Sequence, residues 1–401
     1  MTDQAVPTLP IARTCPYAPH AEHLRLREEA PISRVSLPSG AEVWALTRHE
    51  DIRAMLTDPR FSSDRTNPSF PLLTPGQRQA GRQGFKTMLI SMDPPEHGPA
   101  RRAVVGEFTV KRMAALRPRI QQIVDECVDR LLAGPRPADL VQALSLPVPS
   151  LVICELLGVP YADHEFFQER SGKLLRRTTE VPDRIRAVDE LQSYLDGLVT
   201  GKEKNPTDDL LGRQILKQRE DGGVDHDSLV SMAFLLLIAG HETTANMISL
   251  GTLTLLEHPE QLAAIRADAG KTESAVEELL RYFTIAEFAT SRFAKEDVEI
   301  GGVLIHAGEG GVGLSNTANR DPEAFADPDE FDVERGARHH IAFGFGAHQC
   351  LGQNLARMEL RIVFDTLFAR IPGLKLAVPA EELPFKDDAN VYGIYELPVT
   401  W

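Results

Sequence analysis

One cysteine lies in a segment with the features of a reactive site. Cys350 stands in the glycine-rich stretch FGFGAHQCLG, and apolar residues recur at helical spacing from Leu351 to Leu367. Glycine tolerates positive φ and has no Cβ, so Gly344, Gly346 and Gly352 let the backbone turn tightly and approach a large flat ligand. The free N–H groups and dipole at the start of a helix favour an anion. We therefore predict that the thiol is held as a thiolate, the form that ligates a metal.

A thiolate in such a loop has more than one possible use. It can ligate iron, take part in redox chemistry or act as a nucleophile. A lone cysteine can also be an inert core residue, because a free thiol packs as a small hydrophobe. The other cysteines, Cys15, Cys127 and Cys154, show neither C-x-x-C nor disulfide-like spacing. The residues around Cys350 are therefore needed to choose among these uses.

The residues around the thiol form a specific pattern. It is F-x-x-G-x-H-x-C-x-G, made by Phe343, Gly346, His348, Cys350 and Gly352. The pattern resembles the haem-binding signature of the cytochrome P-450 family, the haem-thiolate monooxygenases. The resemblance implies haem b (iron protoporphyrin IX) as cofactor, Cys350 as the axial ligand of the iron and Phe343 packed beside it. It also implies a mainly α fold with a smaller β-rich lobe, a triangular prism in which a long central helix lies over the haem.

Cationic side chains at two other places have the spacing to hold an anion. In SMDPPEHGPARR the prolines precede a helix, and His97 and Arg101 lie four residues apart on one face of it. A solvated helix surface explains such a pair equally well when it is taken alone. The family resemblance implies that His97 and Arg101 bind one haem propionate. It further implies that Arg292 binds the second and faces the haem edge with His348.

A long apolar stretch is predicted to form the wall of the site. The residues from Ser228 to the helix end at Pro259 read as one buried helix of about 30 residues, roughly 45 Å long. Its middle is polar, and a glycine followed by threonine hydroxyls is a place where a helix can widen or kink. A satisfied polar patch at a helix crossing is the alternative interpretation. The family pattern A-G-x-[DE]-T matches the residues from Ala239 to Thr243. The resemblance implies that Ala239 lies beside the cofactor, and that Glu242 is the acid and Thr243 the alcohol that relay protons for oxygen activation.

A third motif is predicted to be structural. Glu278 and Arg281 are three residues apart in SAVEELLRYF, on one helix face. At a surface such a pair contributes only about 0.2–0.5 kcal/mol. The resemblance implies instead that the pair is buried, is joined by Arg335 and supports the loop that presents Cys350.

The overall composition fits one soluble domain. The 401 residues contain no linker or charge block, so we predict a single domain over 1–401, with a β-rich lobe at roughly 30–65, 290–315 and 374–399 and helices elsewhere. A formal charge of −15 argues against a nucleic-acid surface. The N-terminus lacks a signal-like pattern, and no apolar run was expected to approach the roughly 18 residues of a membrane span. We expect a cytoplasmic monomer that binds no membrane.

The resemblance also implies a mainly apolar substrate pocket, although each lining residue fits an ordinary core equally well. The predicted lining residues are Met88, Leu89, Leu235, Ile238, Ala239, Ile285, Phe288, Ala289 and Ile394, with Arg82 as a polar contact. Actinobacterial sequences similar to this one oxidise bulky lipophilic compounds, so a polyketide or macrolide, a sterol-like compound or a xenobiotic is the expected substrate class.

Electrons are expected to come from outside the chain. The dinucleotide pattern G-x-G-x-x-G after a strand is absent from the sequence. A ferredoxin, reduced by a ferredoxin reductase, is therefore the expected donor, with O2 as co-substrate. A basic docking patch is predicted, although a solvated surface explains each member equally well. Its members are Arg101, Arg102, Lys111, Arg112, Arg335, Arg338 and Arg357.

Three functions remain open from the sequence. The leading hypothesis is a monooxygenase that inserts one oxygen atom from O2 into a C–H bond, most simply a hydroxylation in secondary metabolism. A peroxide-driven haem oxygenase and a non-enzymatic haem sensor or carrier are the alternatives. The acid and alcohol at Glu242 and Thr243 favour the first, because proton delivery is needed when O2 is the oxidant.

Overall fold

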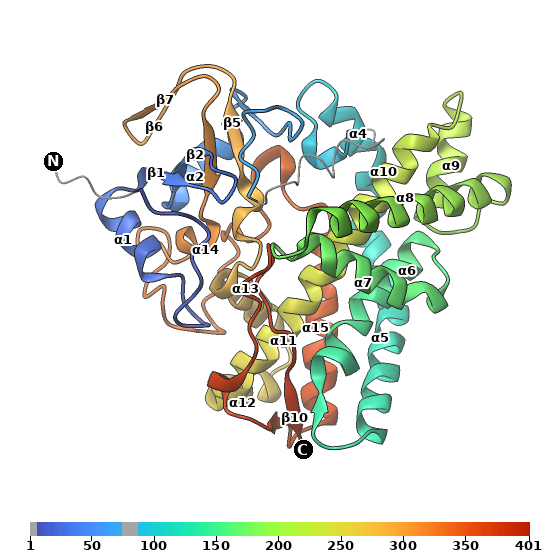
Figure 1. Ribbon diagram of the computed structural model, residues 1–401. Helices are drawn as coiled ribbons and strands as arrows, with labels where there is room; N and C mark the ends of the chain where they lie inside the picture. Colours follow the sequence, from blue (N-terminus) through green and yellow to red (C-terminus); the bar gives the residue numbers. More distant parts are fainter. Residues whose placement is uncertain (1–5, 74–86) are drawn as a thin grey trace.

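Helices make up most of the molecule, and the larger sheet lies to one side of them (Figure 1). The computed structural model describes residues 6–73 and 87–401. The helices are α1 (Ala21–Glu29), α2 (His49–Thr57), α4 (His97–Val105), α5 (Val110–Ala133), α6 (Pro147–Leu157), α7 (His164–Leu175), α8 (Val181–Lys204), α9 (Leu210–Glu220), α10 (His226–Gly240), α11 (Glu242–Glu257), α12 (Pro259–Ala267), α13 (Lys271–Phe283), α14 (Ser315–Ala318) and α15 (Gln353–Arg370). The prediction of a mainly α protein with a smaller β region is confirmed.

The larger sheet has five strands in the order β1-β2-β8-β5-β3. Its strands are β1 (Ile32–Ser36), β2 (Glu42–Leu46), β8 (Gly310–Gly313), β5 (Arg292–Ala294) and β3 (Phe61–Ser62). The predicted hairpin is present: β1 and β2 pair antiparallel, and Gly40 takes a φ of +82° in the turn between them. The hairpin β6 (Val298–Ile300) and β7 (Val303–Ile305) extends from this lobe (Figure 1). Strand β5 begins at Arg292, so the sheet fixes where that arginine lies.

The C-terminal strands do not join that lobe, which corrects the predicted lobe boundaries. Strands β9 (Lys375–Leu376) and β10 (Pro398–Thr400) pair with β4 (Ala138–Asp139) in a separate three-stranded sheet. Figure 1 shows β10 and the C-terminus at the lower end of the molecule, beside the helices. The sequence shows that this tail is extended, but it does not show which distant strand the tail pairs with.

The helix that follows the cysteine loop is anchored in the core. Helix α15 packs against α5, α13 and α11. The crossing with α11 is close: a Cβ at Gly251 would lie 2.5 Å from Cζ of Phe364, a side chain that is 1% exposed. Close packing of this kind fixes the start of α15 and therefore the position of Cys350.

The central span is two helices rather than one. Helix α10 ends at Gly240, α11 begins at Glu242, and His241 stands between them. The predicted interruption at the polar centre is therefore present. Asp225 caps the start of α10, since its side chain accepts a hydrogen bond from the backbone N–H of Ser228. By length and composition His226–Glu257 would pass as a membrane span, contrary to the expectation from the sequence, but 56% of its apolar window is buried within the fold.

Glu278 lies between two arginines beneath the loop that leads to the thiol. Its carboxylate accepts hydrogen bonds from Nε and Nη2 of Arg281 at 2.8 and 2.7 Å, and from Nε of Arg335 at 3.1 Å. Arg281 also donates to the backbone carbonyls of Asn319 and Pro328. Both Glu278 and Arg281 are fully buried. The three residues tie α13 to the irregular segment that precedes the cysteine loop.

Replacing Glu278 with alanine leaves a fully buried guanidinium without its anion. We expect the free energy of unfolding to fall by about 3–5 kcal/mol, because an unpaired buried charge is costly. Denaturant unfolding measures this loss, and E29A, which breaks the exposed Arg25–Glu29 pair, is the control and should change stability little. Equal stabilities for E278A and E29A would contradict the structural role of the buried carboxylate.

Candidate functional site

The cysteine loop is held by its own backbone and by α2. The backbone N–H of Cys350 donates to the carbonyl of Phe343 at 2.8 Å. Gly346 has a φ of +71°, and a Cβ there would lie 2.9 Å from the carbonyl oxygen of Leu56. A side chain at this position would push the loop off α2. The motif glycine is therefore required by both backbone conformation and close packing.

Burial opposes the ionisation of the thiol. Burial among protein atoms raises the pKa of the Cys350 thiol, although the residue has exposed surface. The backbone N–H groups of Gly352 and Gln353 and the charges of Arg101 and Arg357 lower the pKa without offsetting burial. The helix start therefore does not by itself account for the predicted thiolate. A coordinated metal cation would itself displace the thiol proton.

The four residues predicted to bind the propionates or to face the haem edge lie together. Nη2 of Arg101 donates to the carbonyl of Gln349 at 2.6 Å, which ties α4 to the cysteine loop. The rings of His97 and His348 have centroids 4.0 Å apart. The pKa of His348 is lowered to about 3, first by burial and then by the charges of Arg292, His97 and Arg101. The pKa of Arg292 falls to about 10, chiefly because its side chain is buried.

Arg65 belongs to the same cluster and was not predicted. It follows β3, and its charge lowers the pKa values of both Arg292 and His348. Burial lowers the pKa of Arg65 itself, and its Nε is buried without a hydrogen-bond partner. No pattern in the sequence indicates it, because Arg65 matches no motif and reaches the cluster only through the fold. We define the cation cluster as Arg65, His97, Arg101, Arg292 and His348.

The cation cluster fits an anionic cofactor. Asp93 is the carboxylate that affects His97 and Arg292, but it accepts hydrogen bonds from Ser62 and from the backbone N–H of Ser63. His97 Nε2 is buried without a partner. Burying several cations without an anion is unfavourable, so two propionates suit this place. Among residues 6–73 and 87–401 no group of three or more His, Cys, Asp or Glu could hold a metal.

The predicted acid and alcohol point to different partners. The hydroxyl of Thr243 donates to the carbonyl of Ala239 at 2.7 Å, one helical turn earlier. Ala239 is exposed and Thr243 partly exposed, whereas Glu242 is buried. The Glu242 carboxylate instead accepts from Nζ of Lys386 at 3.1 Å. The structure therefore shows no hydrogen bond between Glu242 and Thr243. Lys386 comes from the C-terminal segment, and no pattern in the sequence indicates its contact with Glu242.

The predicted substrate contacts differ in their burial. Leu235, Ile238, Met88 and Leu89 are partly buried, and Ala289 is exposed. Ile394 is completely buried and Ile285 nearly so, as core residues are, while Phe288 packs against the cluster under the larger sheet. These three side chains therefore fit the alternative interpretation, in which they are ordinary core residues. Arg82 lies outside the described residues.

The predicted basic patch is partly neutralised. Arg335 pairs with Glu278, Arg357 with Glu277 and Arg338 with Glu273. Arg101 faces the cysteine loop rather than solvent. Arg102, Lys111 and Arg112 remain exposed on the described chain.

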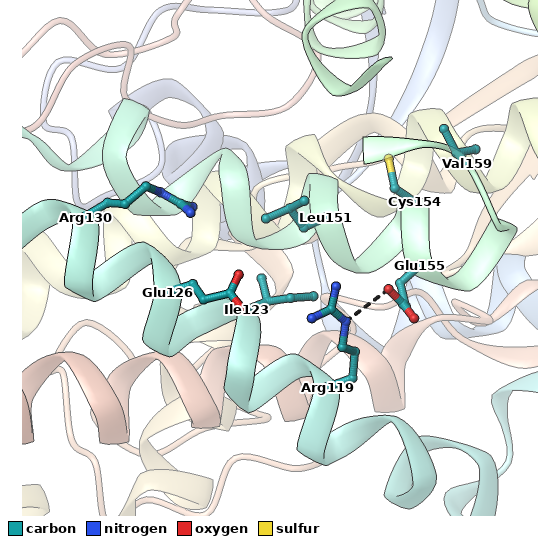
Figure 2. Close-up of a pocket in the computed structure, with 8 residues that line it drawn as sticks. All are labelled: Arg119, Ile123, Glu126, Arg130, Leu151, Cys154, Glu155 and Val159. Carbon is teal, nitrogen blue, oxygen red and sulfur yellow. Dashed lines mark hydrogen bonds and ion pairs between the residues drawn. The ribbon is translucent and has the colours of Figure 1, made fainter. Parts of the chain in front are cut away.

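A hollow between α5 and α6 lies apart from these residues (Figure 2). It has a volume of about 250 Å³ and is crossed by the ion pair of Arg119 and Glu155, 3.1 Å apart. Cys154 borders it, but burial raises the pKa of that thiol to about 12. A thiol with so high a pKa is a poor nucleophile or metal ligand. None of the predicted site residues lines the hollow.

The fold and the site together describe a helical protein with one thiol beside a cluster of cations suited to an acidic macrocycle. The family model described as Cytochrome P450 matches residues 183–372. Pentalenic acid synthase of Streptomyces avermitilis is 54% identical over 394 residues, 98% of this chain and 96% of that protein. The structure of cytochrome P450 MoxA from Nonomuraea recticatena is 62% identical with a TM-score of 0.92 over 98% of each chain.

A third relative has a ligand in its structure. The mycinamicin VIII C21 methyl hydroxylase MycCI from Micromonospora griseorubida, bound to mycinamicin VIII, has a TM-score of 0.93 and 41% identity, over 99% of this chain and all of that one. The chain therefore belongs to the cytochrome P450 family. It is a haem b monooxygenase of the soluble actinobacterial type, as the sequence resemblance implied, and such enzymes take electrons from redox partner proteins and act on lipophilic substrates.

Removing the charge of Arg65 should weaken haem retention. We expect R65Q to lose haem roughly tenfold faster or more, because a hydrogen bond to a charged group is worth about 1.5–3 kcal/mol. Transfer of haem to excess apomyoglobin, followed by absorbance, measures the rate. R60Q, which alters an exposed arginine paired with Asp58, is the control. Identical rates for R65Q, R60Q and the parent protein would remove Arg65 from the cofactor site.

Proposed function

We propose that this enzyme hydroxylates an unactivated C–H bond of a bulky lipophilic secondary metabolite, with Cys350 as the axial ligand of the haem iron. The observation that carries the proposal is the loop of Cys350, fixed through Gln349 to Arg101 of the cation cluster. One hydrogen bond thereby joins the loop of the thiol to an arginine that we propose binds a propionate. The bound haem supplies the activation of O2.

The residues of this chain divide the remaining tasks. The cation cluster orients the propionates, Phe343 packs beside the sulfur, and the exposed face at Ala239 and Thr243 borders the place where oxygen and substrate meet. The Thr243 hydroxyl holds a proton at Oγ1, and Glu242 is the acid that replenishes it. The hydrogen bond from Thr243 to the Ala239 carbonyl holds that hydroxyl in a defined orientation until a better acceptor is present.

A polyketide or macrolide is the substrate class that the relatives favour. MycCI is described as a methyl hydroxylase of mycinamicin VIII, and pentalenic acid synthase is named for its product. Leu235 and Ile238 lie on the same helix as Ala239 and present apolar surface. Large apolar substrates suit such a wall. A sterol-like compound or a xenobiotic is the second possibility within the same class.

We further propose a single cytoplasmic domain that works as a monomer with a ferredoxin and its reductase. Arg102, Lys111 and Arg112 are exposed cations close in sequence to the Arg101 that contacts the cysteine loop. A small acidic carrier would be steered to such a surface, and its rate of reduction should fall as ionic strength rises.

Replacing Cys350 with serine tests the ligand assignment. We expect the ferrous carbon monoxide complex of C350S to lose the red-shifted absorption band that thiolate ligation gives, because serine offers no soft anionic sulfur. Optical spectra of parent and variant, each scaled to its haem content, provide the measurement. A variant that keeps the band would show that another residue is the ligand.

Replacing Thr243 with alanine tests the oxidant. We expect T243A to consume reductant while forming at least about tenfold less product per electron pair, because proton transfer by a positioned side chain contributes roughly 100- to 10,000-fold. We expect it to retain most of the turnover that added peroxide drives. Product formed per reductant consumed is measured with a ferredoxin, its reductase and a panel of macrolides. Peroxide turnover that greatly exceeds the ferredoxin-driven rate in the parent would favour a peroxide-driven oxygenase. A parent protein that consumes reductant no faster with any ligand would favour a haem sensor or carrier.

A further inference from the structure

A buried carboxylate of α13 holds two side chains beside the cysteine loop. Glu277 is 3% exposed, and it accepts hydrogen bonds from Nε of Arg357 at 2.6 Å and from Nη2 of the same guanidinium at 3.0 Å. Nε2 of His340 lies 3.3 Å from Oε2 of Glu277. Burial alone would raise the pKa of Glu277, but the contacts with His340 and Arg357 lower it to about 2. The carboxylate is therefore ionised, and it anchors one side chain before the loop and one after it.

Both anchored side chains contact the ring of Phe343. The Cζ atom of Arg357 lies 4.6 Å from the centre of that ring, within the range of a cation–π contact. The ring of His340 lies 5.9 Å from the same centre, tilted by 47°. Nη1 of Arg357 also donates to Oε1 of Gln353, one turn earlier on α15, at 2.9 Å. Three hydrogen bonds therefore hold the guanidinium in one place over the ring.

The backbone of the loop completes this arrangement. The N–H of Ala342 donates to Nδ1 of His340 at 3.2 Å. In the neutral ring the proton is therefore on Nε2, the atom that faces Glu277. The carbonyl of Phe343 accepts the hydrogen bond from the N–H of Cys350. A displacement of Phe343 would therefore be transmitted to the residue that bears the thiol.

The charge of Arg357 acts on the sulfur of Cys350. Arg357 follows Cys350 by seven residues, and its charge is one of those that lower the pKa of the thiol. Reduction of an iron bound to that sulfur would add one negative charge to the site. A cation held nearby favours the state with the additional negative charge, because opposite charges attract. The effect depends on where the guanidinium is held, and Glu277 determines that position.

We propose that Arg357 is a positioning residue for the proposed iron ligand: held over Phe343 by Glu277, its cation raises the reduction potential of the bound haem. The inference rests on the proposed role of Cys350. In the step concerned, one electron passes from the redox partner protein to the ferric iron, which becomes ferrous. No covalent bond of this chain forms or breaks, and no proton moves. This role differs from the docking contact that the sequence predicts for Arg357.

The first test measures the reduction potential of the haem-loaded protein. R357M keeps most of the length of the side chain that packs on Phe343, but it removes the charge. We expect the equilibrium constant for one-electron reduction to fall roughly tenfold, a shift of about 59 mV to more negative potential. R357K keeps the charge and should stay closer to the parent protein. If R357M retains both the parent potential and the red-shifted carbon monoxide band, the inference fails.

A matched control on the same helix separates position from net charge. Arg361 lies one turn further along α15, about 6 Å from Arg357 along the helix axis, and 3.7 Å from Glu273. R361M should leave the potential unchanged, and a shift equal to that of R357M would overturn the inference. Should R357M fail to retain haem, R357Q gives the same comparison, because it also lacks the charge but can still donate to Glu277.

The second test removes the whole ion pair. R357M/E277Q has the net charge of the parent protein, so a shift in its potential reports where the cation was held. We expect a shift of the same sign as in R357M but smaller. Resonance Raman spectroscopy should show a higher iron–sulfur stretching frequency in R357M, because the cation no longer draws electron density from the sulfur.

Failure of the inference and failure of the ligand assignment give different results. If C350S keeps the red-shifted carbon monoxide band, the assignment of Cys350 is wrong and the inference falls with it. If C350S loses the band while R357M/E277Q has the parent potential, only the inference about Arg357 fails.

Discussion

The site depends on a group of buried arginines whose positive charge the carboxylates of the protein do not neutralise. Arg65, Arg101 and Arg292 converge with two histidines in a place where burial already disfavours charge. The cost of this arrangement is visible in the lowered pKa values, above all that of His348. Such a cluster is stable only when an anion completes it, and two carboxylates on one rigid ligand meet that need without bringing in mobile acidic side chains.

The same charge arrangement decides how the thiol is presented. Arg101 connects the cation cluster to the cysteine loop through Gln349, so the position of the proposed axial ligand is coupled to that of a proposed propionate site. Glu278, buried between Arg281 and Arg335, fixes the segment that enters that loop. Contacts both within the loop and before it restrict the position of the sulfur, which is the kind of preorganisation that a metal centre requires.

Much of this could be predicted from the sequence, but only where the chemistry is local. The cysteine motif, the His97–Arg101 spacing and the interrupted central helix each lie within a few residues, and the cofactor and family followed from them. Arg65 and Lys386 were missed because each reaches the site through tertiary contacts that leave no spacing pattern. The desolvation that raises the pKa of the Cys350 thiol was missed for a related reason: the helix start is visible in the sequence, whereas the burial that opposes ionisation depends on the packed fold.

The central claim is that one sulfur of this chain is bonded to the iron of a haem. Iron-edge X-ray absorption of the purified haem-loaded protein tests it most directly, because the fine structure reports the atoms bound to the metal. We expect the iron to be surrounded by porphyrin nitrogens and one sulfur atom. The sulfur neighbour should be lost in a variant that lacks Cys350. A shell made only of nitrogen and oxygen in the parent protein would contradict it.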